Sequence, residues 1–260
     1  MTLSQRRSAL VRRLHRRKTR EREGLVLVEG VRAAREALDA DARVRFALLA
    51  PSLQTTADGP ALTSVLVNSP AETTEVPDAE LSALSGTENP QGVLLVCSEP
   101  EHDLAATEHG PILVLDALQD PGNVGTLIRS AVAFDFAGVW LLPGSADPWG
   151  AKAVRASAGS AFRRPVVRCH LSEVQQQIRQ SSLELWAAAA DGVRIDRSAG
   201  DADRASVCLV VGNEGRGVSA EVRESADKIV RVEMPGPTES LNAAIAGSIL
   251  MHALGGGAPS

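Results

Sequence analysis

Short apolar runs alternate with amphipathic segments along most of this 260-residue chain. Continuous apolar runs, as at residues 112–115 and 207–211, are typical of strands that are buried on both faces. Between such runs, apolar residues recur every three or four positions, as at Val124, Leu127 and Ile128, which predicts amphipathic helices. The alternation predicts an α/β protein with a mostly parallel sheet covered on both faces.

The pattern falls into two blocks of elements. Strands are expected at residues 24–30, 44–50, 62–68, 93–97, 112–115, 139–142, 165–168, 183–190, 207–211 and 230–232. Helices are expected within residues 1–23, 31–38, 77–85, 124–132, 149–160, 171–179 and 240–254. A polar, acidic stretch without periodicity, residues 98–110, separates the blocks. We therefore predict a smaller N-terminal α/β domain at residues 1–97, a linker at 98–110 and a second domain at 111–260.

Charge is distributed unevenly between the N-terminus and the rest of the chain. Residues 1–23 carry nine Lys or Arg and two Glu, a net charge of +7. The remaining 18 basic and 30 acidic residues give −12, consistent with the overall −5. A basic arm on an acidic body predicts binding to a polyanion, and a solvated helix face is the alternative explanation. The many arginines favour the polyanion, because guanidinium groups match the geometry of phosphates.

Composition argues against several classes of protein. Aromatic residues make up 3% of the chain and Tyr is absent, so rows of base-stacking rings are not expected. Cys97, Cys169 and Cys208 lie far apart and the histidines are scattered, so we expect no metal site and a reduced, cytoplasmic protein. No run approaches the roughly 20 apolar residues of a membrane span, so we expect no membrane partner.

Three groups of polar residues follow predicted strands, where ligands of α/β proteins commonly bind. They contain Asn123 and Arg129, Gly212 and Glu214, and Ser240 and Asn242. Taken singly, Asn123 and Ser240 could be helix caps, and Glu214 could be an exposed turn residue. Arg129 is harder to explain in this way, because a guanidinium on a helix that is predicted to be buried needs an anionic partner. A dinucleotide site is disfavoured, because Gly-Asn-Val-Gly at residues 122–125 is not GxGxxG.

The same residues carry a family resemblance. DPGNVGTLIRSA at residues 120–131, VVGNEGRGV at 210–218 and SLNAAIA at 240–246 resemble, in order and spacing, the three motifs of the SpoU (TrmH-like) RNA ribose 2′-O-methyltransferases. DPWGAKAVRASAGSAFRRPV at residues 147–166 is similar to the linking segment of that family. LVEGVRAAREAL at residues 27–38 looks more loosely like the family's L30e-type substrate-binding domain.

The resemblance implies an enzyme that uses S-adenosylmethionine to methylate a ribose 2′-hydroxyl in structured RNA. It also implies a C-terminal trefoil knot of the SPOUT superfamily and a homodimer with catalytic pockets at the subunit interface. The family's catalytic positions fall on Asn123, Arg129, Glu214, Ser240 and Asn242. Its cofactor positions fall on or beside Gly212, Val232, Met234 and Leu241. We expect ribosomal RNA as the substrate; the alternatives are transfer RNA, or a non-catalytic RNA-binding or ribosome assembly factor of the same fold.

The resemblance also implies roles for individual residues. Arg129 falls on the position of the proposed activator of the hydroxyl, but a guanidinium keeps its proton near neutral pH. We therefore expect Arg129 to hold the target phosphate and stabilise developing negative charge, with Glu214 orienting it. At residues 232–234 the chain has Val-Glu-Met where family members often have Ile-Pro-Met, which places a charge in the cofactor loop.

Overall fold

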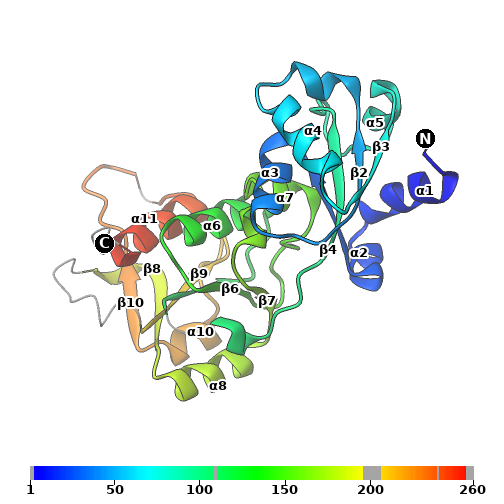
Figure 1. Ribbon diagram of the computed structural model, residues 1–260. Coiled ribbons are helices and arrows are strands. Elements are labelled where there is room, and N and C mark those ends of the chain that lie inside the picture. The colour runs from blue at the N-terminus through cyan, green and yellow to red at the C-terminus, as the bar shows by residue number, and fades with distance from the viewer. Residues whose placement is uncertain (1–2, 108–109, 196–205, 239, 256–260) are drawn as a thin grey trace. The chain divides into compact units, whose positions relative to one another are not determined.

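The chain folds into two compact units (Figure 1). The computed structural model describes residues 3–107, 110–195, 206–238 and 240–255. Unit 1 comprises Met1–Glu101 and Asp147–Arg163, and unit 2 comprises His102–Ala146 and Arg164–Ser260. The sequence pattern assigned residues 147–163 to the second domain, whereas in the structure they pack with the N-terminal unit.

Unit 1 is built on a mixed sheet with the strand order β1-β4-β2-β3. Its strands are β1 (Leu25–Glu29), β2 (Val44–Leu49), β3 (Glu72–Glu75) and β4 (Val93–Ser98). β4 is antiparallel to both β1 and β2, and β3 is parallel to β2. Its helices are α1 (Gln5–Leu14), α2 (Arg17–Glu23), α3 (Val31–Asp39), α4 (Gly59–Val67), α5 (Asp78–Leu84) and α7 (Ala151–Ala156). Short 3-10 helices lie at η1 (Pro51–Thr55) and η3 (Ser160–Phe162).

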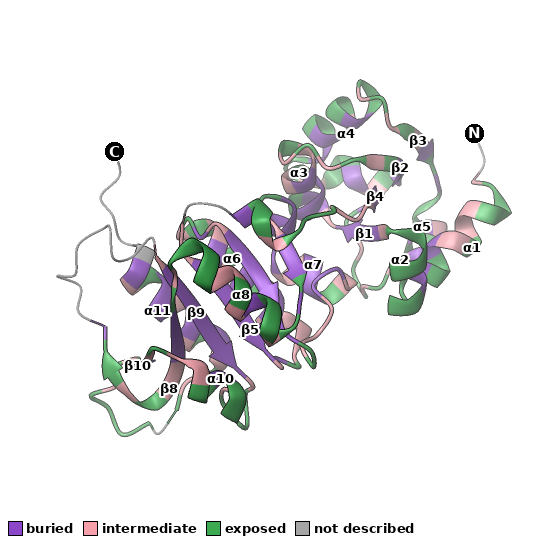
Figure 2. Cartoon of the chain, turned by 90° about the horizontal axis from the view of Figure 1, so that it is seen from below, coloured by how far each residue is buried: buried purple, intermediate pink, exposed green. Residues whose placement is uncertain are grey.

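The basic N-terminal arm folds as two helices on the surface of unit 1. α1 ends at Leu14, and α2 begins after Arg16, whose backbone is extended. Val11 and Leu14 are buried in the core of unit 1, and Leu10 packs partly against that core. Most of α2 is exposed (Figure 2). Val11 and Leu14 therefore hold the arm on the domain and leave most of its cations in solvent.

The prediction of a strand at residues 62–68 is wrong, because α4 occupies this segment. Pro60 lies in the first turn of the helix, where its fixed φ and missing N–H are well tolerated. Leu62 and Leu66, four positions apart, are buried, while Val65 and Val67 are exposed. A helical spacing of buried residues thus outweighs the strand preference of the branched side chains. The fourth strand of the sheet is instead β3, a polar edge strand that hydrophobic patterning did not predict.

Three arginine–carboxylate pairs attach residues 147–163 to the rest of unit 1. They join Arg20 to Asp147, Arg155 to Glu29 and Arg163 to Glu36. The side chains of Arg20 and Asp147 are only 6% and 9% exposed, and their N–O distance is 2.5 Å. Gly159 adopts φ +87°, and a Cβ there would lie 2.6 Å from the carbonyl oxygen of Ala33. The segment is therefore closely packed against α3 and cannot be removed without exposing buried charge.

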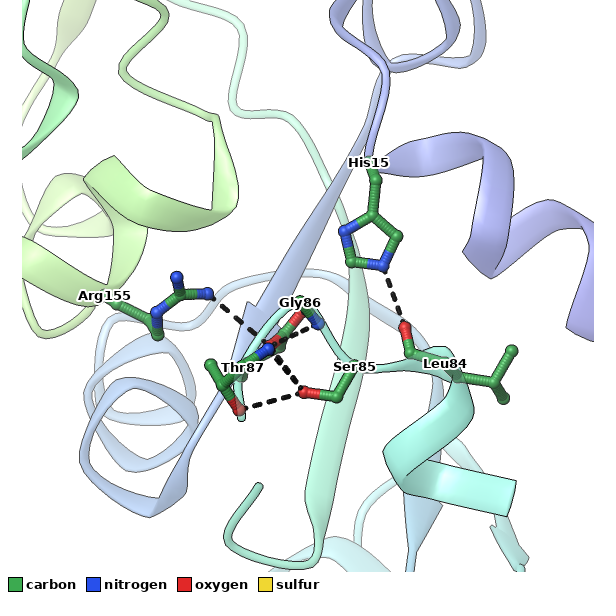
Figure 3. Close-up of polar contacts among 7 residues, drawn as sticks. His15, Leu84, Ser85, Gly86, Thr87 and Arg155 are labelled. Atoms are coloured by element: carbon green, nitrogen blue, oxygen red, sulfur yellow. Dashed lines mark hydrogen bonds and ion pairs between the residues drawn. The ribbon is translucent and has the colours of Figure 1, made fainter. Parts of the chain in front are cut away.

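Glu29 is buried at the end of β1 and organises the loop that precedes β4. Figure 3 shows Ser85, Gly86 and Thr87 of this loop with Arg155 nearby. Its carboxylate accepts hydrogen bonds from Ser85 Oγ at 2.9 Å and from the backbone N–H of Gly86 at 3.0 and 3.1 Å. Beside this loop, His15 Nε2 lies 2.8 Å from the carbonyl oxygen of Leu84, at hydrogen-bond distance. The buried charge is thus compensated by hydrogen bonds as well as by its arginine partner.

Unit 2 is built on a six-stranded sheet with the order β10-β8-β9-β5-β6-β7, in which every printed pairing is parallel. Its strands are β5 (Ile112–Asp116), β6 (Gly138–Leu141), β7 (Val166–Arg168), β8 (Glu184–Arg194), β9 (Val207–Gly212) and β10 (Lys228–Arg231). The helices α6 (Pro121–Ala133) and α11 (Ala243–Gly255) cover one face, and α8 (Leu171–Ser181) and α10 (Ala220–Ser225) cover the other (Figure 1). A short 3-10 helix, η2 (Leu104–Thr107), precedes the sheet. The predicted α/β fold with a mostly parallel sheet is confirmed.

The strand order reverses at the centre of the unit 2 sheet. After β5 the chain builds β6 and β7 on one side, and it then returns to build β8, β9 and β10 on the other. β9 pairs with β5, so the carboxyl ends of these two strands are adjacent. A reversal of this kind opens a crevice at the carboxyl ends of the strands, where ligands bind in α/β sheets. The loops after β5 and β9 carry Asn123 and Glu214, so the topology brings these residues to one edge.

Candidate functional site

The loop after β5 presents Asn123 on the first turn of α6. Asp120 is the N-cap of this helix, and its Oδ1 accepts from the backbone N–H groups of Gly122 at 2.6 Å and Asn123 at 3.0 Å. Pro121 occupies the first helical position, where its missing N–H costs no hydrogen bond. Because Asp120 caps the helix, the side chain of Asn123 makes other contacts, and a capping role for Asn123 is excluded.

The turn after β9 is held in place by Asn213. The backbones of Asn213 and Gly217 exchange two hydrogen bonds of 2.9 Å, and Asn213 Oδ1 accepts from two further N–H groups within the turn. Asn213 Nδ2 donates to the carbonyl oxygen of Ala117 at 2.9 Å, which ties this turn to the loop after β5. A Cβ at Gly212 would lie 2.2 Å from the backbone nitrogen of Val218, so the turn itself requires glycine there.

Glu214 reaches from this turn to the loop after β5. Its Oε1 accepts from Asn123 Nδ2 at 2.9 Å and from the backbone N–H of Asp120 at 3.2 Å, and its Oε2 accepts from the N–H of Gln119 at 3.4 Å. Burial alone would raise the pKa of the Glu214 carboxyl, but the hydrogen bonds from Asn123 and from the backbone outweigh it and lower the pKa. Glu214 is therefore ionised near neutral pH.

Asn242 continues this row of hydrogen bonds from the start of α11. Its Nδ2 donates to Asn123 Oδ1 at 3.1 Å, while its Oδ1 accepts from the backbone N–H groups of Ala244 at 2.9 Å and Ile245 at 3.3 Å. Asn242 thus caps α11 and holds Asn123 at the same time. Because each amide oxygen accepts and each amide nitrogen donates, both asparagines have a defined orientation. We call Glu214, Asn123 and Asn242 the hydrogen-bonded row.

A pocket of about 210 Å³ lies beside the hydrogen-bonded row. It is formed by the turn after β9, the chain after β10 and the loop that leads into α11. The predicted site residues in its lining are Gly212, Glu214, Val232, Met234, Ser240 and Leu241. The structure therefore brings the four predicted cofactor residues and two of the five predicted catalytic residues to one cavity.

Comparison with known proteins identifies the family. The family model described as the SpoU rRNA Methylase family matches residues 110–252, which is more than half of the chain. The chain belongs to the SpoU rRNA methylase family. A second family model, described as the MRM3-like substrate binding domain, matches residues 10–95. The resemblance read from the three motifs is confirmed.

Relatives of known structure or named activity resemble the chain over nearly its whole length. The 23S rRNA (guanosine(2553)-2′-O)-methyltransferase RlmP of Bacillus subtilis is 32% identical over 245 residues, which cover 94% of each chain. A TrmH-family protein of known structure from Porphyromonas gingivalis is 30% identical with a TM-score of 0.83, over 98% of both chains. The SpoU methyltransferase AviRb from Streptomyces viridochromogenes, solved in complex with AdoMet, is 28% identical with a TM-score of 0.84, over 97% of both chains.

Two of the predicted catalytic residues stand apart from the hydrogen-bonded row. Arg129 is exposed on α6, and within the described residues it makes no hydrogen bond or ion pair. The expected contact of Arg129 with an anionic partner, the RNA phosphate, therefore stays a prediction. Among the described residues the carboxylate of Glu214 bonds Asn123, and it makes no contact with Arg129. Ser240 lines the pocket, and its hydroxyl has no partner in the described part of the chain, so it does not cap α11.

The departure from the SpoU pattern at residues 232–234 is accommodated at the surface. Val232 and Met234 line the pocket, whereas Glu233 is absent from its described lining. The Glu233 carboxylate instead lies 2.9 Å from Nη1 of Arg194 on β8, and both side chains are exposed. The added charge is thus paired outside the cavity, and its neighbours Val232 and Met234 line the pocket with apolar side chains.

Sequence reasoning missed two residues that position the turn after β9. Asn213 links the turn to Ala117, and the buried Asp116 accepts from the backbone N–H of Ser219 at 2.6 Å. The signals were present, because an Asn in a glycine-rich turn commonly bonds the backbone two residues on. An acid that ends an apolar strand, as Asp116 does, must find donors when it is buried.

The rest of the described chain adds little further chemistry. No group of three or more His, Cys, Asp or Glu within the described ranges could hold a metal ion. The cysteines are free and buried, and burial raises the pKa of Cys97 and Cys169 to about 12. Where the structure describes helices, none combines the length and the apolar character that crossing a membrane requires.

Proposed function

We propose that this protein transfers a methyl group from S-adenosylmethionine to a ribose 2′-hydroxyl of ribosomal RNA, in the first place 23S rRNA. One observation carries the proposal. Three loops place Glu214, Asn123 and Asn242 in one hydrogen-bonded row beside a pocket, in a chain of the SpoU family. A set of unrelated caps and turn residues would not converge in this way.

The pocket suits the methyl donor. S-adenosylmethionine, when bound, supplies a methyl group activated by a positively charged sulfur. Val232, Met234 and Leu241 offer an apolar surface for its adenine ring, and Gly212 adds backbone without a side chain. The ionised carboxylate of Glu214 lines the same pocket and favours a cationic ligand.

The hydrogen-bonded row orients the groups that would contact the methyl acceptor, the ribose 2′-hydroxyl. Transfer requires the 2′-oxygen to lie roughly 3 Å from the methyl carbon and to lose its proton. Glu214 and Asn242 hold the amide of Asn123 from both ends, so its remaining N–H can bind a ribose or phosphate oxygen without rearrangement. Because the pKa of Glu214 is lowered, its carboxylate is a weak base and serves to orient Asn123. A phosphate oxygen of the RNA then shares the proton of the hydroxyl.

Arg129 is available for the RNA phosphate. Its guanidinium is exposed and, among the described residues, unpaired, so binding an RNA phosphate does not require it to leave a protein carboxylate. A guanidinium holds a phosphate through two parallel hydrogen bonds and stabilises negative charge near the reacting oxygen. Ser240, whose hydroxyl is exposed in the pocket lining, is the remaining polar contact that we assign to substrate or donor.

The structure sorts eight of the nine cations of the basic arm into two sets; the ninth, Arg13, is exposed and adds to the hydrogen bond from Arg22 in lowering the pKa of Glu23. The cations that are engaged in ion pairs are Arg7, Arg17, Arg20 and Arg22. The cations that are exposed and, within the described ranges, form no hydrogen bond or ion pair are Arg6, Arg12, Arg16 and Lys18. We assign RNA phosphate contacts to the second set, because an unpaired surface cation can exchange its counterions for phosphate.

A homodimer with pockets at the subunit interface and a trefoil knot are further parts of the proposal. Ile245 and Ile249, which are 52% and 40% exposed, lie one turn apart on α11. Their neighbours Ala246 and Leu250 line the pocket, so the exposed face of α11 is next to the site. A second copy of the chain that covers these isoleucines would complete the pocket.

Ribosomal RNA is our preferred substrate over transfer RNA. A separate N-terminal domain with a basic arm suits a large folded RNA. Free, buried cysteines support the reducing cytoplasm as the place of action.

Two measurements test the proposal. Calorimetry of the full chain should detect S-adenosylmethionine binding, and a non-catalytic assembly factor need not bind it. Mapping of 2′-O-methyl groups in total RNA, with and without the gene, should show the loss of one site in ribosomal RNA. If the lost site lies in transfer RNA instead, transfer RNA is the substrate. Unchanged methylation together with no donor binding would reject the proposal.

A further inference from the structure

Unit 1 contains a second pocket, of about 440 Å³, in which none of the site residues discussed above takes part. It lies at the carboxyl ends of the parallel strands β2 and β3 and is bounded by η1, α4 and the chain that enters α5. Leu49, Ala50 and Val76 form a buried apolar floor, and Pro51 and Pro77 are exposed residues of the lining. Its volume is within the range of pockets that hold small ligands.

A hydrogen bond links the two segments of the lining that contain Pro51 and Pro77. The backbone N–H of Ser52, next to Pro51, donates to Oδ1 of Asp78, next to Pro77, at 3.1 Å. The backbone N–H of Val76 donates to the carbonyl oxygen of Leu49 at 2.8 Å, which closes the floor. These two bonds join the segments on either side of the pocket, so the pocket is preformed.

The polar groups of the pocket are mostly hydrogen-bond acceptors. Gln54 Nε2 donates to Thr63 Oγ1 at 2.8 Å, and this hydroxyl donates in turn to the carbonyl oxygen of Gly59 at 2.9 Å. The network orients the amide so that Oε1 of Gln54 is the atom left without a partner in the described chain. The carboxylate of Glu75 is exposed and likewise has no partner among the described residues.

This arrangement excludes phosphate and favours a neutral ring that donates hydrogen bonds. A carboxylate repels an anion, and no Lys or Arg is among the described residues of the lining. In RNA, the ribose 2′-hydroxyl and the amino and imino N–H groups of the bases can donate, and unpaired bases are read by such contacts in protein pockets. Guanine presents two adjacent N–H donors on one edge, which match the two oxygens of a carboxylate.

We propose that this pocket of unit 1 takes an unpaired guanine of the RNA, with Glu75 accepting from its imino and amino groups and Gln54 accepting a further N–H. Pro51 and Pro77 flank the ring, and Leu49 and Val76 contact its inner edge. The inference rests on RNA being the substrate of the proposed function. It assigns the N-terminal unit a base-specific contact in addition to the phosphate contacts of the basic arm.

Nucleoside binding to the full chain tests this assignment directly. The methyl signals of Leu49 and Val76 would be followed by NMR during titration with guanosine, inosine, cytidine and uridine. Guanosine should bind most tightly, and inosine, which lacks the amino group, should bind about five- to tenfold more weakly. Glu75→Gln should weaken guanosine binding by about tenfold, because one acceptor becomes a donor.

A matched variant controls for the general loss of negative charge. Glu88→Gln changes an exposed carboxylate of unit 1 that does not line the pocket, and it should leave guanosine binding unchanged. Equal binding of guanosine and uridine, equal effects of the two variants, or no perturbation of these methyl groups by guanosine would overturn the inference. S-adenosylmethionine binding in the same preparation separates the two proposals. If the donor binds and guanosine does not, the pocket assignment alone fails; if guanosine binds and the donor does not, the catalytic proposal fails.

Discussion

The side-chain amide of Asn123 donates to the carboxylate of Glu214 at 2.9 Å, although the two residues lie 91 positions apart in the chain. The contact links the loop after β5 to the turn after β9, and Asn242 extends it to the loop that enters α11. Asn123 is therefore held at both ends of its amide. The three sequence motifs of the family meet at this asparagine, so its removal should disturb the acceptor side and spare the donor pocket.

Asn123→Ala should lower the rate of methyl transfer by about 100-fold, because a preorganised donor near developing negative charge is lost. The dissociation constant for S-adenosylmethionine should be nearly unchanged, since Asn123 does not line the pocket in the described chain. Single-turnover transfer from labelled donor and calorimetry measure the two quantities separately.

A variant of the same type outside the row is the control. Asn68→Ala removes an exposed amide in unit 1 that donates to the carbonyl oxygen of Ser64, and it should retain the wild-type rate. The effects of Asn123→Ala and Asn242→Ala should not be additive, because the two residues act through one contact. An Asn123→Ala enzyme with more than half of the wild-type rate would contradict the assigned role.

The pKa of Glu214 predicts how the site responds to acid. Its pKa is lowered, so the stabilising contribution of the ionised carboxylate is fully present above the ordinary carboxyl pKa. That contribution is lost as the pH falls through the lowered value. Asn123→Ala removes a hydrogen bond that lowers the pKa and leaves the burial that raises it, so the pKa should rise. The carbon-13 shift of the Glu214 carboxyl during a pH titration measures this directly, and an unchanged midpoint would show that the backbone donors alone set the pKa.

The sequence was sufficient to predict most of the helices and strands, and the loops that carry the polar site residues. The strands at β5 and β9 are continuous apolar runs, and the polar residues that follow them stand out against such runs. Patterning could also place Ser240 and Asn242 at the start of the last helix, although it could not tell which of the two is the cap. That choice depends on where the helix begins, and element ends are the part that local propensity determines least.

Contacts between distant segments could not be derived from the sequence. Arg129 was expected to have an anionic partner because it lies on a helix with an apolar stripe, and in the structure it is exposed, with no protein partner in the described part of the chain. Residues 147–163 lie between two strands of unit 2 in the chain, yet they pack in unit 1 through pairs such as Arg20 with Asp147. Periodicity identifies which face of an element is buried, and it does not identify the element that covers this face.

The pair of Arg20 and Asp147 should be important for stability. Both side chains are almost fully buried, and Arg20 also donates to the carbonyl oxygen of Leu14 at 2.8 Å. Arg20→Ala leaves Asp147 buried without this partner, which should lower the free energy of unfolding by about 3–5 kcal/mol. Urea unfolding followed by fluorescence of the buried Trp149 in the same segment measures the change.

Arg17→Ala is the matched comparison within the same helix. Arg17 and Glu21 form an ion pair of 2.7 Å, but their side chains are 52% and 45% exposed. The loss of such a pair should change stability by about 0–1 kcal/mol. If Arg17→Ala and Arg20→Ala destabilise the protein equally, the buried pair does not anchor the segment and the difference in burial has no energetic consequence.

The unpaired cations of the arm should set the salt dependence of RNA binding. Each phosphate contact that is lost lowers the slope of log K against log salt by about 0.7–0.9. The triple variant Arg12→Ala, Arg16→Ala and Lys18→Ala should therefore reduce the slope by about two. Fluorescence anisotropy with a labelled transcript of 23S rRNA at several salt concentrations measures it, and thermal unfolding should be little changed because the three side chains are exposed.

A variant that deletes an ion pair of zero net charge distinguishes the loss of phosphate contacts from a general disturbance of the helix. The double variant Arg17→Ala and Glu21→Ala deletes an ion pair of α2 and leaves the net charge unchanged, so its slope should equal that of the wild type. A triple variant with the wild-type slope would mean that the arm is a solvated helix face. A reduced slope with an unchanged kcat would place the arm in RNA capture, because Arg12, Arg16 and Lys18 are not part of the hydrogen-bonded row or the pocket beside it.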